Sequence, residues 1–403
     1  MSVAPVAGRE LDAEPKRVSP LELFFDLVFV FAITQVTALM ADDPTWGGLA
    51  RGLLVLAAIW WAWAAYAWLT NEVDPDRPAV RVATFAAMVA MLIASLAAPE
   101  AFGDHPLLFA LAYLGIRLLH IALFAAGTDD VGVRQAVRAL APPALLAPAG
   151  LVVAASLDGA VRELVWLGVL LADYVLGGAR GIGGWRLSPG HFVERHGLIV
   201  IIALGESIVA IGVGAAGSDL GAAELAAAAL GVIVAAALWW TYFDRIAALG
   251  ERTLERRPAG VARNTLARDS FSYLHLAMVA GIVLLALGVK KTLGDVGEDL
   301  KAVAALGVAG GVAVYLLAQA AFEARNDHPL DGPRALAAAA CVALVPLATV
   351  VPALVALAAV AAVCVALVAF EARAAVGRTA PRALPSAVDG GPAARRRRAG
   401  GRA

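Results

Sequence analysis

The chain has 403 residues, of which 61% are hydrophobic and 16% are charged, and its mean hydropathy is +0.78. Soluble domains carry about 45–50% apolar and about 25% charged residues, so this composition excludes an ordinary soluble protein. A net charge of −1 excludes a nucleic-acid partner held by an overall basic excess. The long Ala, Leu and Val runs lack the alternation of barrel strands. They therefore predict an all-α, polytopic membrane protein.

Because a span needs about 20 mostly apolar residues, the sequence predicts about twelve membrane-spanning helices. The first six are predicted near residues 20–41, 48–70, 80–98, 105–127, 138–157 and 160–178. The second six are predicted near residues 196–216, 224–244, 270–290, 301–322, 334–351 and 353–371. Prolines make three of these spans irregular, namely the fifth (Pro142, Pro143 and Pro148) and the last two (Pro346 and Pro352).

The polar flanks and short loops predict the orientation of the chain. Residues 1–19 are polar and mixed in charge, which is not the pattern of a cleavable signal peptide. Under the twelve-span scheme, most Lys and Arg residues of the short loops fall on the side of this N-terminus. Cytoplasmic loops carry such an excess, so both termini are predicted to be cytoplasmic, in the bacterial cytoplasmic (inner) membrane. Residues 372–403 predict a disordered basic tail, attracted to anionic lipids by about 1 kcal/mol per basic residue.

Short sequence matches recur in the same order in the two halves of the chain. Ser19-Pro20 and Ser188-Pro189 each resemble an N-cap followed by a proline at the first helical position. The further matches are LVFVFAITQ with LIVIIALGE (27–35 and 198–206), IWWAW with LWWTY (59–63 and 238–242), AMVA with AMVA (87–90 and 277–280) and RLLHIALF with YLLAQAAF (117–124 and 315–322). This order predicts two parallel six-helix repeats, over 20–178 and 188–371, related by a pseudo-two-fold axis along the membrane normal.

One carboxyl group is predicted at the centre of a span. Glu206 lies within IVIIALGESIVAIG, where an ionisable side chain costs at least about 2.5–3.5 kcal/mol and normally has a partner or a function. Gly205 and Ser207 beside it permit close helix packing, and its counterpart in the first half is Gln35. Two interpretations stay open. Glu206 binds a proton or a ligand at the repeat interface, or it is a structural carboxyl group that is protonated or paired with an arginine.

A second set of polar residues is predicted in the fourth and sixth spans. Arg117 and His120 are three residues apart in YLGIRLLHIALF and so lie on one helix face. Asp173 lies in the sixth span. An unpaired guanidinium would be very costly at this depth, so Arg117 is expected to pair with Glu206 or Asp173. Both a structural ion pair and a working site agree with this pattern.

The first turns of spans one and seven carry further charges. Ser19 and Glu22 have the form of a capping box, which accounts for Glu22, whereas Asp26 lies deeper between apolar residues. The corresponding stretch of the second half, HFVERH, contributes His191, Glu194, Arg195 and His196. The two histidines are five residues apart, a poor spacing for a shared metal on a helix, so neither a metal site nor a cofactor is predicted.

The stretches SPLELFFDLVFVFAITQVT and HFVERHGLIVIIALGESIVAIG closely resemble the two signature segments of the low-temperature-requirement A (LtrA) family of bacterial membrane proteins. The resemblance covers roughly residues 16–372. It implies a multi-pass membrane protein linked to growth at low temperature, and it implies no substrate or reaction. The family's motif positions fall on Glu22, Asp26, His191, Glu194, Arg195, His196, Gly205, Glu206 and Ser207.

Three hypotheses for function follow. The first is a transporter-like protein, a proton-coupled secondary transporter of a small solute. In it Glu206 carries a proton, Arg117 and Arg195 tune Glu206 or hold an anion, and Asp26 gates the cytoplasmic side. A continuous polar path from Asp26 to Glu206 would favour this hypothesis.

The second hypothesis is a membrane-embedded enzyme or lipid-handling protein, in which His191, Glu194 and His196 are acid–base groups at the cytoplasmic interface. Motif residues crowded at one depth would favour it. The third is a structural cold-adaptation factor without turnover. No Walker loop, HExxH or GxSxG occurs in plausible context, so ATP hydrolysis and standard hydrolase chemistry lack support. On balance the chain is not expected to be an enzyme. The partners expected are membrane lipids and a small solute or a proton, with no signal for an oligomeric state.

Overall fold

In the computed structural model of this chain, the structure describes residues 17–75, 77–127, 131–179, 185–216 and 221–379. Within these ranges the chain folds into helices and forms no β-strand. Residues 1–16 of the predicted N-terminal segment and residues 380–403 of the predicted basic tail lie outside the described residues. The last helix continues to Thr379, so residues 372–379, predicted as the beginning of the tail, are helical.

The first half of the chain folds into six long helices. They are α1 (Pro20–Asp42), α2 (Trp46–Glu72), α3 (Pro78–Ala97, followed by a 3-10 turn, Ala98–Glu100), α4 (Pro106–Gly127), α5 (Val131–Ala154) and α6 (Gly159–Ala179). The prolines of the predicted fifth span lie within α5, which the structure shows as one helix.

In the second half, three π-helical segments each join two successive helices. The helices are α7 (Pro189–Ala215), α8 (Ala222–Thr241), α9 (Ala247–Arg256), α10 (Val261–Ala267), α11 (His275–Gly294), α12 (Ala302–Ala305), α13 (Gly311–Arg325), α14 (Gly332–Leu347) and α15 (Ala353–Thr379). The π-helical segments join α8 to α9 (Tyr242–Ile246), α10 to α11 (Arg268–Leu274) and α12 to α13 (Leu306–Gly310). Such segments are rare and often lie at functional sites.

Local sequence signals explain where several helices begin. The Ser19 hydroxyl accepts a hydrogen bond from the Glu22 amide at 3.3 Å, and the Glu22 carboxylate accepts one from the Ser19 amide at 2.8 Å. The predicted capping box of α1 is therefore confirmed. Ser188 precedes α7 in the same way, with Pro189 in the first turn, but its side chain makes no capping hydrogen bond.

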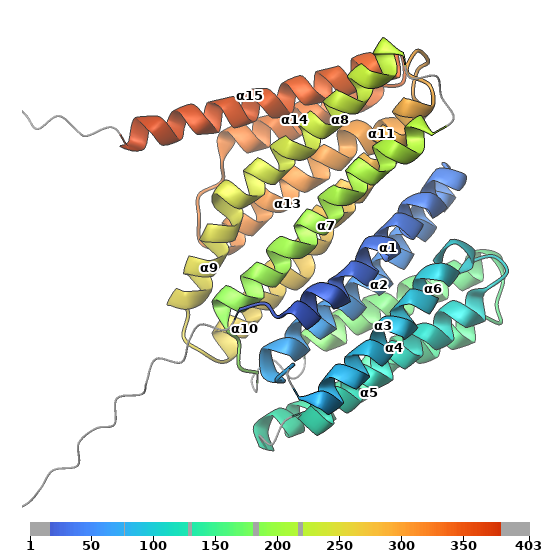
Figure 1. Ribbon diagram of the computed structural model, residues 1–403, viewed down its shortest axis with the longest axis vertical. Helices are drawn as coiled ribbons and strands as arrows, with labels where there is room; N and C mark the ends of the chain where they lie inside the picture. The colour runs from blue at the N-terminus through green and yellow to red at the C-terminus, as the bar shows by residue number, and fades with distance from the viewer. Residues whose placement is uncertain (1–16, 76, 128–130, 180–184, 217–220, 380–403) are drawn as a thin grey trace, which may run out of the picture.

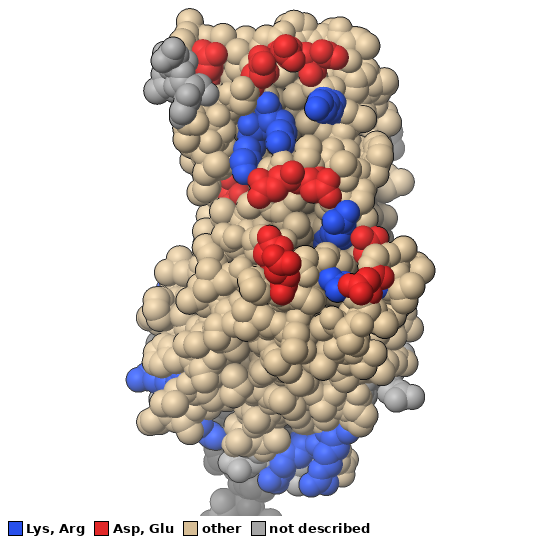
Figure 2. Space-filling view, turned by 90° about the vertical axis from the view of Figure 1, so that its right-hand side faces the viewer, with Lys and Arg blue, Asp and Glu red and all other residues tan. Residues whose placement is uncertain are grey.

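Apolar helices of membrane-spanning length dominate the molecule. In the part of the chain that the structure describes, nine helical segments are long and apolar enough to cross a membrane. The other three predicted spans, 138–157, 160–178 and 334–351, fall on α5, α6 and α14. Large apolar side chains such as Leu27, Val82 and Leu164 are more than half exposed, which suits contact with lipid and not with water. On the face in Figure 2, charged side chains gather in the upper half and along the lower edge, with a basic group at the left edge, and the middle of the lower half shows none.

The helices form two groups that lie side by side (Figure 1). In the first group α1 packs on α2 and α3, and successive contacts join α3 to α4, α4 to α5, α5 to α6 and α6 to α2. In the second group α7 packs on α8 and α11, and successive contacts join α11 to α13, α13 to α14, α14 to α15 and α15 to α8. The groups meet where α1 and α2 pack on α7 and α11. The motif-bearing helices α1 and α7 are therefore central.

Glycines let α11 approach the helix that continues into α13. A Cβ atom on Gly281 would lie 2.6 Å from the Gly311 carbonyl oxygen, and one on Gly311 would lie 2.6 Å from the Gly281 carbonyl oxygen. Gly288 and Gly307 approach each other as closely, seven residues further along α11. Since no side chain fits at these contacts, the two helices pack backbone to backbone.

Candidate functional site

Four motif side chains form one buried charge cluster between α1 and α7. Arg195 donates from Nη1 to Glu22 Oε1 at 2.9 Å and from Nη2 to Asp26 Oδ1 at 2.6 Å. His191 Nε2 lies 3.0 Å from Glu22 Oε1. None of the four side chains is more than 2% exposed. We call this group the α1–α7 cluster.

The α1–α7 cluster follows from the spacing of its residues. Glu22 and Asp26 are four residues apart on α1, and His191 and Arg195 are four apart on α7, so each pair lies on one helix face. Both pairs lie within the first two turns of their helices. Once α1 and α7 pack together, two carboxylates face one guanidinium and one imidazole.

Helix α2 completes the surroundings of the α1–α7 cluster. The Trp63 indole donates to Asp26 Oδ1 at 2.9 Å, and the Arg195 guanidinium lies 5.8 Å from the Trp63 ring, within cation–π range. Thr70 Oγ1 accepts from Arg195 Nη1 at 3.1 Å. A cavity of about 10 Å³, close to the space that one water needs, lies against Glu22, Thr70 and Arg195.

The charges of the α1–α7 cluster do not balance without a proton. With both carboxyl groups ionised, Arg195 charged and His191 neutral, the formal charge is −1. One added proton brings it to zero. Within the described chain, Asp26 Oδ2 and His191 Nδ1 have no hydrogen-bond partner. Because an uncompensated buried charge is costly, the charges of the cluster balance only when one of these groups holds an additional proton.

Glu206 lies elsewhere on α7. Its carboxylate accepts a hydrogen bond from the Thr34 hydroxyl of α1, and its side chain is 2% exposed. No described Lys, Arg or His side chain lies within ion-pair distance of it, so Glu206 is not the one of the two expected partners that the structure brings to Arg117. A Cβ atom on Gly205 would meet no described atom within 4 Å, so Gly205 makes no close helix contact here. Ser207 is buried beside it.

Apolar side chains separate Glu206 from the α1–α7 cluster. Asp26 and Thr34 are eight residues apart on α1, which corresponds to about 12 Å along a helix. Phe29, Ile33 and Val200 are buried in between. No hydrogen bond between described residues joins the two groups. The described residues therefore form no continuous hydrogen-bonded path from Asp26 to Glu206.

Arg117 and Asp173 come together as one of the two expected pairings. Arg117 Nη2 lies 3.6 Å from Asp173 Oδ2, and Arg117 Nε donates to the Ala144 carbonyl at 3.3 Å. His120 Nε2 lies 3.1 Å from the Ala65 carbonyl oxygen of α2. All three polar side chains are buried.

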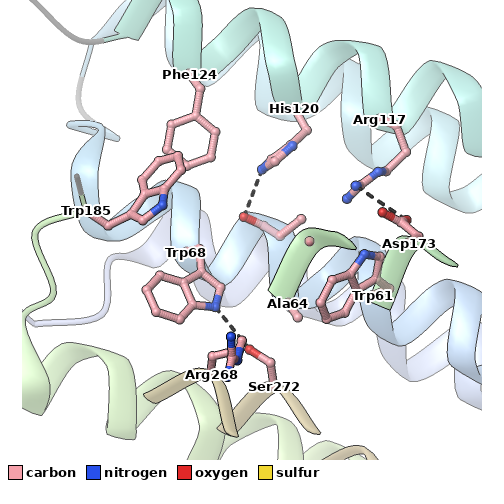
Figure 3. A pocket seen from close by; sticks show the side chains of 12 residues that line it. Trp61, Ala64, Trp68, Arg117, His120, Phe124, Asp173, Trp185, Arg268 and Ser272 are labelled. Atoms are coloured by element: carbon pink, nitrogen blue, oxygen red, sulfur yellow. Dashed lines mark hydrogen bonds and ion pairs between the residues drawn. The ribbon is translucent and has the colours of Figure 1, made fainter. Parts of the chain in front are cut away.

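A cavity of about 90 Å³ lies beside this pair (Figure 3), enough for a small solute or several waters. Its walls come from α2, α4 and α6 of the first group and from the π-helical segment Arg268–Leu274 of the second. Trp68 of α2 donates to the Ser272 hydroxyl at 3.0 Å, and Trp60 donates to the Ser272 carbonyl at 2.7 Å. We call this space the inter-group cavity, because residues of both helix groups line it.

The remaining motif residues do not join the α1–α7 cluster. Glu194 is exposed and accepts from the Val18 amide at 3.2 Å. His196 makes no hydrogen bond to a described side chain. Its Nδ1 lies 2.8 Å from the Phe192 carbonyl oxygen, and aromatic rings such as Trp63 and Phe271 surround the imidazole. The three acid–base groups considered for an enzyme, which include His191, therefore do not converge. No described group of three or more His, Cys, Asp or Glu residues could hold a metal ion.

A third buried cluster of charged side chains lies around Arg334, and the sequence did not predict it. Arg334 of α14 donates to Glu371 Oε1 at 2.6 Å and to Gln319 Oε1 at 3.1 Å, and Glu323 Oε1 lies 3.5 Å away. Arg334 is the first residue of the predicted span 334–351, where a charged side chain is expected to face a loop, yet its side chain is fully buried. One signal was present: Glu371 follows Asp173 by 198 positions, the separation of the matched segments that begin at 117 and 315.

Comparison with known proteins agrees with the motif segments. Residues 17–369 match the family described as bacterial low temperature requirement A protein (LtrA). The chain is also similar to an uncharacterized protein of Rhizobium meliloti (strain 1021), with 28% identity over 292 residues that cover 70% of each chain. The matched range includes α1, α7 and every residue of the α1–α7 cluster. This chain therefore belongs to the bacterial low temperature requirement A (LtrA) family of membrane proteins.

Proposed function

We propose that this protein is a proton-coupled secondary transporter of a small solute, built from two parallel six-helix repeats in the bacterial cytoplasmic membrane. The observation that carries the proposal is the α1–α7 cluster, a buried group of charges that balances when it holds one proton. Ionisable groups inside membrane proteins commonly mark proton or substrate pathways.

The packing of the helices supports the two repeats. The order of contacts is the same in both groups if α1 to α6 correspond to α7, α8, α11, α13, α14 and α15. That correspondence makes twelve spans from the nine apolar helices together with α5, α6 and α14. The Lys and Arg bias of the loops then favours cytoplasmic termini.

The spacing of the contacts supports a pseudo-two-fold axis through the α1–α7 cluster. Glu22 contacts His191, and Asp26 contacts Arg195, and each pair is separated by 169 positions. The same separation relates Ser19 to Ser188. A residue can touch its own symmetry mate only near the axis, so both contacts support an axis between α1 and α7.

In the proposed mechanism, proton binding loosens the contact between the repeats. Protonation of Asp26 removes one of the carboxylates that hold Arg195, and so weakens the attraction between α1 and α7. The inter-group cavity lies between the same two groups, so their relative movement opens or closes it. Rocking of one repeat against the other is how many secondary transporters alternate access.

Glu206 supplies a second proton site in this proposal. No described basic side chain lies within ion-pair distance of it, so an ionised carboxylate there would lack a close counter-charge. The apolar layer around Phe29 and Val200 separates it from the α1–α7 cluster and would act as a barrier in this conformation.

One observation favours the enzyme or lipid-handling hypothesis. The four residues of the α1–α7 cluster crowd into the first turns of two helices, at one depth. The cavity against them measures about 10 Å³, however, which admits no lipid or organic substrate. Since Glu194 and His196 also point elsewhere, transport is the better-supported hypothesis.

The test is solute-driven proton movement in proteoliposomes that contain a pH-sensitive dye. Soluble solutes of different charge and size are added to one side, with wild type, Asp26→Asn and Glu194→Gln compared. We expect one solute class to drive a pH change in wild type and in Glu194→Gln, whose side chain lies outside the cluster. Asp26→Asn should abolish it. Folded wild-type protein that moves protons with no solute class would contradict the proposal.

A further inference from the structure

The inter-group cavity contains a guanidinium with unused donors. Arg117 is 3% exposed, and its Nε donates to the Ala144 carbonyl. A guanidinium has five N–H donors. In the described chain the other four make no hydrogen bond, because the nearest carboxylate oxygen, on Asp173, is 3.6 Å from Nη2. Figure 3 shows the end of Arg117 beside Asp173 at the wall of the cavity. Arg117 therefore presents a planar fork that suits a carboxylate.

Flat aromatic side chains form much of the remaining wall. Trp61, Trp68, Phe124 and Trp185 all line the cavity. Two of them are fixed by neighbours: the Trp61 ring stacks on Tyr174 at 4.2 Å, and the Trp68 indole is hydrogen-bonded to Ser272. Fixed aromatic faces favour a flat ring, which stacks on them with little loss of conformational freedom.

The charges that line the cavity favour an anion. They are the guanidinium groups of Arg117 and Arg268 and the carboxylate of Asp173. Arg268 comes from the π-helical segment, where it pairs with Asp269 at 2.6 Å. Because Asp269 compensates the charge of Arg268, the guanidinium left for a ligand is that of Arg117, whose remaining donors suit a carboxylate and repel an organic cation.

We propose that the inter-group cavity binds a small monocarboxylate with a flat, ring-like body. The carboxylate lies on the fork of Arg117 and the ring lies between the tryptophans. Asp173 is a competitor for the guanidinium and keeps it in place when no ligand is bound. That this ligand is the transported solute rests on the proposed function, whereas its binding does not.

Benzoate is the probe, and the purified full-length protein in lipid nanodiscs is titrated by calorimetry and by tryptophan fluorescence. We expect saturable binding of benzoate, with little binding of the neutral isostere benzamide or of acetate, which lacks the ring. Arg117→Gln should weaken benzoate binding by about tenfold or more, the effect of losing a charge-assisted hydrogen bond. Arg252→Gln, at an exposed site on α9, should leave binding unchanged.

Asp173→Asn separates ligand binding from structural damage. Because it removes the carboxylate that competes for Arg117, it should tighten benzoate binding, by about tenfold if the competing charge is worth one hydrogen bond. If the pair were merely structural, both Arg117→Gln and Asp173→Asn would weaken the protein and its binding together. Weaker binding in Asp173→Asn than in wild type would overturn the inference.

The selectivity of binding and the dye assay also test the proposed carboxylate site. Equal binding of benzoate and benzamide, or binding of tetramethylammonium in place of benzoate, would overturn the inference. If the protein does not bind benzoate but other solutes drive proton movement, the proposed carboxylate site is wrong and the proposed function still stands. Benzoate binding without any proton movement would confirm the site and contradict the coupling.

Discussion

At the scale of single residues, this protein stabilises buried charges in different ways. Arg195 has two carboxylates, a hydroxyl and an aromatic face around it. Arg117 has one carboxylate at a longer distance and a cavity beside it. Glu206 has a hydroxyl partner and no described basic side chain within ion-pair distance. Several strong partners suit a group that holds helices together, and few partners suit a group that binds something else.

Removal of the Arg195 guanidinium should be strongly destabilising. Arg195→Ala leaves Glu22 and Asp26 as uncompensated buried carboxyl groups, and breaking such a pair costs about 3–5 kcal/mol. Asp26→Asn should cost much less, because its amide oxygen can still accept from Trp63. Thermal unfolding of the two variants in the same detergent checks this order. Equal losses in the two variants would show that the charges of the cluster contribute little to stability.

Glu206→Gln should separate stability from function. The amide can still accept from Thr34, and no ion pair is lost, so the free energy of unfolding should change by about 1 kcal/mol or less. Solute-driven proton movement should nevertheless be lost, because an amide carries no proton. Both quantities are measured on one preparation, by thermal unfolding and by the dye assay. Unchanged proton movement would remove Glu206 from the mechanism.

At the scale of elements, the closest helix contact lies in the second group. The backbones of α11 and α13 touch at Gly281 and Gly311, with no room for a Cβ atom. The neighbouring π-helical segments, Arg268–Leu274 and Leu306–Gly310, interrupt the regular backbone hydrogen bonds of the same two helices. One of them exposes Ser272 to both Trp60 and Trp68. The π-helical segment Arg268–Leu274, which lines the inter-group cavity, therefore continues directly into the closely packed pair of α11 and α13.

A matched pair of glycine substitutions tests this packing. Gly281→Ala places a methyl group 2.6 Å from the Gly311 carbonyl oxygen, so it should destabilise the protein by about 1–3 kcal/mol. Gly205→Ala meets open space on another helix, and should be neutral or stabilising by about 0.5–1 kcal/mol through helix propensity. Thermal unfolding of both variants is the measurement. A neutral Gly281→Ala would mean that the two helices are less tightly packed than the structure indicates.

At the scale of the whole molecule, the helices form two groups whose shared surface runs along α1, α2, α7 and α11. The α1–α7 cluster and the inter-group cavity both lie at that surface, on different faces of α2: Trp63 and Thr70 contact the cluster, whereas Trp61 and Trp68 line the cavity. A movement of the second group relative to α2 would therefore change both sites at once.

The proposed orientation can be checked by labelling of single cysteines. Asp104, between α3 and α4, and Glu255, near the end of α9, are both exposed and should lie on opposite sides of the membrane. A membrane-impermeant maleimide applied to intact cells should label Asp104→Cys and should label Glu255→Cys only after the cells are opened. The native Cys341 and Cys364 are buried and should stay unlabelled. The reverse pattern would invert the proposed topology.

The sequence by itself determined the features that depend on local composition. Hydropathy located the apolar helices, because a segment in lipid must satisfy its own backbone hydrogen bonds. Ser19, Pro20 and Glu22 predicted the beginning of α1, because a capping box involves neighbours along the chain. The motif segments predicted the family, and they contain every member of the α1–α7 cluster.

The tertiary structure decided which charges meet. Arg117 pairs with Asp173 and not with Glu206, and Arg195 pairs with Glu22 and Asp26. Arg334 lies inside the bundle although it precedes an apolar run. Helical spacing tells which side chains share a face, but it does not tell which helix that face meets. The partner depends on the packing of helices far apart in the sequence, and the inter-group cavity exists only where α2, α4, α6 and the π-helical segment Arg268–Leu274 come together.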